Sequence, residues 1–135
     1  MSVGFKYVFY VEVIINLLVA IIALFFPDFL INMLFGETVE FYRFTISLAY
    51  WYAVLLIVIS YIMLRSLISS NLKLMIYVLE GYLIGDILQL IVIFIRIPFG
   101  LIINIGIIFT VSFTIVLIIS RIIVILKPDI LGFTT

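Results

Sequence analysis

Four long apolar stretches, separated by short polar breaks, constrain what this chain can fold into. Each stretch has about the 20 residues that a helix needs to cross the hydrocarbon core of a bilayer. Backbone polar groups in lipid must be satisfied within the segment, so the stretches predict helices. The sequence therefore predicts an all-α integral membrane protein, a four-transmembrane-helix antiparallel bundle with spans at about residues 5–26, 41–65, 72–95 and 101–126.

Composition supports this class. Of the 135 residues, 68% are hydrophobic and 10% charged, with a mean hydropathy of +1.56. Four spans fill the chain, so we expect residues 1–135 to form a single membrane domain. Seven basic residues balance seven acidic ones, which leaves no basic footprint for nucleic acid.

The residue inventory also limits the chemistry. Cysteine and histidine are both absent, which excludes disulfides, thiolate catalysis, Cys/His zinc sites and the commonest haem ligand. The sequence contains no nucleophile–base pair, phosphate-binding loop or metal motif. We therefore expect no catalytic residue, no metal site and no cofactor.

The segment after the first span carries helix signals of its own. Asp28 is a start signal and Gly36 a stop signal. Between them, one helical side is apolar: Phe29, Leu30, Met33 and Leu34. The pattern predicts a short amphipathic helix, lying in the membrane interface or closing the mouth of the bundle as a lid.

The third span carries most of the polar side chains. Glu80 and Asp86 lie within the apolar run, where a charge is costly and usually faces a bundle interior. Gly81 and Gly85 have the spacing that lets another helix approach closely. We expect these glycines to face inward with Asp86, against a stripe of small residues in the fourth span, Gly106, Thr110 and Thr114.

Polar residues of the other spans extend this arc into a candidate site. Glu12 and Asn16 lie four residues apart on one face of the first span, and Arg43 opens the second span. The candidate intramembrane polar site comprises Glu12, Asn16, Arg43, Glu80, Tyr82, Asp86 and Gln89. Such a site suits proton relay, cation binding, recognition of a lipophile's polar head, or structural hydrogen bonding, and the spacing does not separate these roles.

Basic residues set the expected orientation in the membrane. With four spans, both termini share a side, and that side holds five basic residues: Lys6, Arg65, Lys73, Arg121 and Lys127. The other side holds Arg43 and Arg96. The positive-inside rule then predicts a cell-membrane protein with both termini in the cytoplasm.

Several of these features resemble DoxX-like and EXPERA-type small membrane proteins. The first span ends at Pro27, Arg43 opens the second, and the third carries Glu80 and Gly85-Asp86. The resemblance implies a four-helix bundle and, from the EXPERA-type members, a lipophile pocket in which Glu12, Glu80 and Asp86 are candidate residues. The first-span arginine and glycines of DoxX-like proteins and the histidine of sterol isomerases are missing, so isomerase activity is not implied.

The leading functional hypothesis is a small non-catalytic accessory subunit of a larger membrane complex, for which an energy-transducing complex is a natural setting. Its partners would be the lipid bilayer and other membrane subunits, or further copies of itself. One alternative is a stand-alone protein that binds a sterol, quinone or other lipophilic small molecule at the intramembrane carboxylates. The other is a small proton-coupled transporter.

Overall fold

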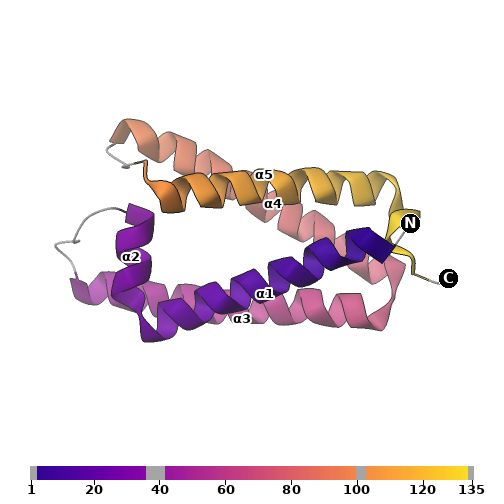
Figure 1. Ribbon diagram of the computed structural model, residues 1–135, viewed down its shortest axis with the longest axis horizontal. Coiled ribbons are helices and arrows are strands. Elements are labelled where there is room, and N and C mark those ends of the chain that lie inside the picture. Colours follow the sequence, from indigo (N-terminus) through magenta and orange to yellow (C-terminus); the bar gives the residue numbers. More distant parts are fainter. Residues whose placement is uncertain (1–2, 36–41, 100–102, 134–135) are drawn as a thin grey trace.

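The computed structural model describes residues 3–35, 42–99 and 103–133, and all the regular secondary structure of these residues is helical (Figure 1). The α-helices are α1 (Val3–Phe25), α2 (Pro27–Phe35), α3 (Tyr42–Ser69), α4 (Leu72–Arg96) and α5 (Ile105–Leu126). Two short 3-10 turns follow α4 and α5: η1 (Ile97–Phe99) and η2 (Pro128–Leu131). The helices α1, α3, α4 and α5 are each long and apolar enough to cross a membrane, whereas α2 is too short. The predicted all-α fold with four candidate spans is therefore confirmed.

Helix ends differ from the predicted ones by about a turn, for local reasons. The α3 helix continues to Ser69 because the Ser66 and Ser69 hydroxyls donate to carbonyls of the preceding turn, at 2.8 and 2.9 Å. The α5 helix begins only at Ile105, after the Asn104 side chain accepts a hydrogen bond from the Ile107 amide at 3.0 Å. The Ser69 hydroxyl reaches a carbonyl of the last turn of α3, and Asn104 is the N-cap of α5; both satisfy backbone groups that a helix end leaves open.

The four long helices form two antiparallel pairs, α1 with α3 and α4 with α5 (Figure 1). The pairs converge at the end of the molecule that carries both termini and the α3–α4 turn. In that turn, Ser70 has a positive φ of 52° and Asn71 caps α4, its side chain accepting from the Leu74 amide. We call this end the terminal end.

The predicted short helix is present as α2. Proline at its first position and Asp28 in its first turn suit a helix N-terminus. The helix lies across the end opposite the terminal end and contacts α1, α3 and α5. Leu30 and Ile31 are buried there, whereas Phe29 of the predicted apolar face points outward and is exposed.

The described residues form two hydrophobic cores, one at each end of the molecule, and different helices contribute to each. The terminal-end core draws on α1, α3, α4, α5 and η2, through Phe9, Val13, Met63, Leu67, Met75, Leu79, Val124 and Leu131. The α2-end core draws only on α1, α2 and α3, through Ala20, Ala23, Leu30, Ala53 and Leu56. Alanines on both α1 and α3 let those two backbones approach closely.

The orientation of α4 reverses one prediction. Met75 and Leu79 face inward and are buried, whereas Gly81 and Gly85 are exposed, and a Cβ added to either glycine would meet nothing within 4 Å. The expected contact of these glycines with the small-residue stripe of α5 is therefore not formed. Asp86 faces inward, and at 100° per residue Gly81 lies about 140° from it around the helix.

The small-residue stripe of α5 faces inward but meets another neighbour. A Cβ added to Gly106 would overlap the carbonyl oxygen of Met33 in α2. Thr114 is buried, and the Thr110 hydroxyl donates back to the Gly106 carbonyl at 2.8 Å. Among the glycines within the described helices, Gly106 is thus the one at which a close helix approach occurs, between α5 and α2.

Candidate functional site

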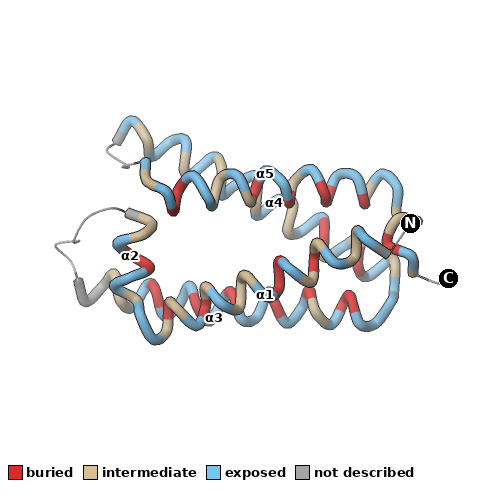
Figure 2. The backbone as a smooth tube through the Cα atoms, in the orientation of Figure 1, coloured by how far each residue is buried: buried red, intermediate tan, exposed pale blue. Residues whose placement is uncertain are grey.

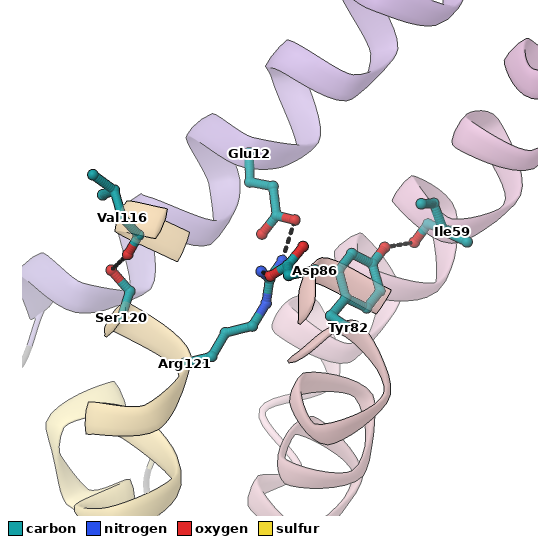
Figure 3. Close-up of polar contacts among 7 residues, drawn as sticks. All are labelled: Glu12, Ile59, Tyr82, Asp86, Val116, Ser120 and Arg121. Atoms are coloured by element: carbon teal, nitrogen blue, oxygen red, sulfur yellow. Dashed lines mark hydrogen bonds and ion pairs between the residues drawn. The ribbon is translucent and has the colours of Figure 1, made fainter. Parts of the chain in front are cut away.

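A fully buried arginine on α5 is the centre of the polar interior. The Arg121 guanidinium forms ion pairs with Glu12 of α1 and Asp86 of α4, and donates a hydrogen bond to Glu12 (Figure 3). We call these three residues the ion triad. It joins the α1–α3 pair to the α4–α5 pair at the inner edge of the terminal-end core.

Helix lengths explain how Glu12 and Arg121 meet. Glu12 lies nine residues after the start of α1, and Arg121 five residues before the end of α5. At 1.5 Å per residue these offsets are about 14 and 8 Å from the terminal end. The remaining gap of about 6 Å is within the reach of an arginine side chain, which can extend its charged group away from its own Cα.

Tyr82 of α4 connects α3, the one long helix that the ion triad does not include, to the same cluster. Its ring lies 5.0 Å from the Arg121 guanidinium carbon, within the range of a cation–π contact. Its hydroxyl donates to the carbonyl of Ile59 in α3 (Figure 3). Side chains and backbone from α1, α3, α4 and α5 therefore all meet around Arg121.

The charges of the triad constrain its chemistry. A buried charge is expensive unless it is paired and hydrogen-bonded. Here one cation serves two carboxylates, and both Glu12 Oε2 and Arg121 Nε lack a hydrogen-bond partner among the described residues. The Asp86 side chain is 13% exposed against 3% for Glu12, so Asp86 is the member closest to the surface. This arrangement suits a structural cross-link between helices.

The structure brings three of the predicted site residues together and leaves the others apart. Glu12, Asp86 and Tyr82 come together around Arg121. Asn16 lies one turn further along α1 and is half-buried. Glu80 and Gln89 are exposed on α4 and do not join the triad. The Arg43 side chain lies outside the described part of the structure.

Arg121 itself was missing from the predicted site, because the sequence analysis placed it among the basic residues that flank a span. Two signals argue for an interior position. It stands five residues inside the end of α5, with isoleucines before and after it, and Lys127 already marks the end of that span. Two carboxylates within spans also call for a counter-charge at similar depth.

Comparison of the chain with protein-family models, with curated protein sequences and with solved structures gives no match. The resemblance to DoxX-like and EXPERA-type proteins therefore stays a sequence-based expectation.

Proposed function

We propose that this chain is a multi-pass membrane protein that serves as a non-catalytic structural subunit of a larger membrane assembly. The observation that carries the proposal is the outer face of α4. There Glu80 and Gln89 are exposed about 180° apart around a 25-residue apolar helix, and Gly81 and Gly85 lie between them. Charged and polar groups facing lipid are costly, so a surface of this kind is best accounted for by a protein neighbour.

The contrast between the two helices of one pair supports this assignment. Only Met75 and Leu79 of α4 are buried, whereas α5 buries seven residues along its length. Most of the α4 surface is therefore free for contacts outside the chain (Figure 2). The ion triad, in this account, holds the two helix pairs together so that α4 is presented in a fixed orientation.

The proposed orientation places both termini in the cytoplasm. Both termini lie at one end of the molecule (Figure 1). With Arg121 assigned to the interior, four basic residues flank the spans at that end and two at the other: Lys6, Arg65, Lys73 and Lys127, against Arg43 and Arg96. The excess favours the cytoplasmic side for the termini, and α2 then lies at the outer membrane surface.

Cysteine labelling tests this orientation, because the native chain has no cysteine. A cysteine replacing the exposed Ser69 is expected to react only from the cytoplasmic side, and one replacing the exposed Asn32 only from outside. Labelling of both positions from the same side would contradict the four-crossing arrangement.

The ligand-binding alternative has less support from the geometry. The carboxylates Glu12 and Asp86 are engaged by Arg121. A surface hollow lined by Tyr50, Trp51 and Val54 lies on α3, where all three side chains are exposed. It contains no carboxylate and faces outward.

The test of the subunit role is native mass spectrometry of the wild-type chain extracted from its own membranes into lipid nanodiscs. We expect stoichiometric membrane-protein partners. A chain that carries no protein partner and holds one stoichiometric lipophilic molecule would overturn the proposal in favour of a ligand-binding role.

A further inference from the structure

We propose that the outer face of α4 binds a transmembrane helix of a different polypeptide, which places a lysine or arginine against Glu80 and packs on Gly81 and Gly85. This inference rests on the proposed subunit role and specifies the chemistry of the partner. It begins from Glu80, an exposed carboxylate within an apolar span.

The position of Glu80 along α4 places it well inside the span. It lies eight residues after Leu72, or about 12 Å along a 25-residue helix that is about 37 Å long. The helix exceeds the roughly 30 Å hydrocarbon core by only a few ångströms at each end. A glutamate side chain is too short to bring its charge from that depth to the interface, so Glu80 needs a polar neighbour.

The chain does not supply that neighbour in its described part. Glu80 forms no ion pair there, since the salt bridges of the triad engage Glu12 and Asp86. Lys73 lies on the same side of α4 but two turns away, and its ammonium lies 6.0 Å from the Tyr77 ring centroid. A basic side chain from outside the chain is the complementary group.

The glycines make room for the helix that would carry it. Gly81 and Gly85 are one turn apart, and both face open space. A backbone can therefore approach α4 along this groove, as in small-residue helix contacts within membranes. Glu80 lies about 100° around the helix from Gly81, on the flank of the glycine contact. A long lysine or arginine side chain on the flank of a helix seated on the glycines reaches its carboxylate from there.

A second copy of this chain fits the face poorly. In a symmetric parallel contact, the two Glu80 carboxylates would lie at the same depth on the same interface. Among the described residues, Arg121 is fully buried, and the other basic residues lie within four residues of a helix end or beyond it: Lys6, Arg65, Lys73, Arg96 and Lys127. A distinct helix with a basic residue at the depth of Glu80 supplies the counter-charge and packs on the glycines.

The experiment uses the full chain reconstituted in phosphatidylcholine vesicles, with designed transmembrane peptides of about 23 residues. The peptides share a leucine–alanine background and one pair of glycines four residues apart, and carry Lys, Leu or Glu at the depth of Glu80. Energy transfer from a donor at a cysteine replacing Ser69 to an acceptor on the peptide reports association. We expect the Lys peptide to associate about tenfold more tightly than the Leu peptide, and the Glu peptide least.

Matched variants locate the contact. Glu80→Gln is expected to remove the preference for Lys over Leu, and Gly85→Leu to weaken every peptide. Gly4→Leu is the control, because Gly4 also faces open space but lies at the start of α1. Circular dichroism and thermal unfolding establish that each variant keeps its fold.

Three outcomes would overturn the inference: equal association of the Lys and Leu peptides, a Lys preference that survives Glu80→Gln, or a self-association of the chain that Glu80→Gln abolishes. The subunit role is judged separately, by the partners of the wild-type chain in its own membranes. Native partners that stay bound in the Glu80→Gln variant would leave the subunit role standing and remove Glu80 from the contact. A wild-type chain without partners would contradict the subunit role whatever the peptides do.

Discussion

The two ends of this molecule hold the same helix pairs together by different means. At the terminal end, all four long helices share one core, and Arg121 places a charge between α1 and α4. At the α2 end, the core includes only α1, α2 and α3, and α2 provides a contact to α5 through Met33 and Gly106. The comparison teaches that the two pairs are joined directly at one end and through a short helix at the other.

The largest effect is expected from removing the charge at the terminal end. Arg121→Leu leaves two carboxylates buried without a counter-ion, and we expect a loss of about 3–5 kcal/mol in the free energy of unfolding. Unfolding of the purified chain in mixed detergent micelles, followed by circular dichroism, measures it. The triple variant Glu12→Leu, Asp86→Leu and Arg121→Leu is the control, and it is expected to recover most of the stability because no charge stays buried. An Arg121→Leu variant as stable as the wild type would show that the ion triad does not stabilise the fold.

A somewhat smaller effect is expected from the apolar part of the same end. Leu79→Ala opens a cavity among helices of both pairs, and we expect a cost of about 2–4 kcal/mol. Leu88→Ala on the same helix is the matched control, because Leu88 is 56% exposed and its truncation is expected to change the free energy of unfolding by less than about 0.5 kcal/mol. Equal costs at the two positions would mean that α4 is rotated from its described orientation.

The α2 end is expected to respond to overpacking. Gly106→Leu forces apart α5 and α2, at a cost of about 1–3 kcal/mol. Gly85→Leu, which adds the same side chain where the structure has open space, is expected to leave the stability of the isolated chain unchanged. Thermal unfolding of the two variants side by side distinguishes the glycines, and a reversed order of their melting temperatures would contradict the assignment of inner and outer faces.

The smallest effect is expected from the link between α3 and α4. Tyr82→Phe keeps the ring beside Arg121 and removes the hydroxyl that donates to the Ile59 carbonyl, so we expect a loss of about 0.5–1.5 kcal/mol. Tyr82→Leu removes the ring as well and is expected to cost more. A Tyr82→Phe chain as unstable as Tyr82→Leu would show that the hydrogen bond to α3 accounts for the loss, and that the contact of the ring with Arg121 of α5 adds nothing.

The helices and part of the polar cluster could be predicted from the sequence. The four spans and the short helix followed from hydropathy and from Asp28 and Gly36, because membrane crossing requires a helix length that a sequence displays directly. Glu12, Asp86 and Tyr82 were found because polar residues within apolar runs are rare and stand out. Pattern alone was sufficient for these features.

The rest depended on which way each helix turns, which composition does not determine. A face with glycines and a carboxylate suits an intramolecular contact and an intermolecular one equally well. Of the arc of α4 predicted to face inward, Tyr82 and Asp86 do so, whereas Gly81 and Gly85 face outward. Arg121 was counted among the flanking charges because it lies five residues from the end of its helix. Its long side chain reaches Glu12 and Asp86 from there, and side-chain reach across a bundle is not visible in a helical wheel.

The central claim, that a single arginine is shared between Glu12 and Asp86, is tested most directly by a double-mutant cycle. Glu12→Gln or Asp86→Asn alone leaves Arg121 paired with the other carboxylate, and each amide can still accept a hydrogen bond, so each is expected to cost less than about 1 kcal/mol. The double variant leaves the buried guanidinium without a counter-ion and is expected to lose about 3–5 kcal/mol in the free energy of unfolding. A double variant whose cost equals the sum of two small single costs would contradict the shared arginine.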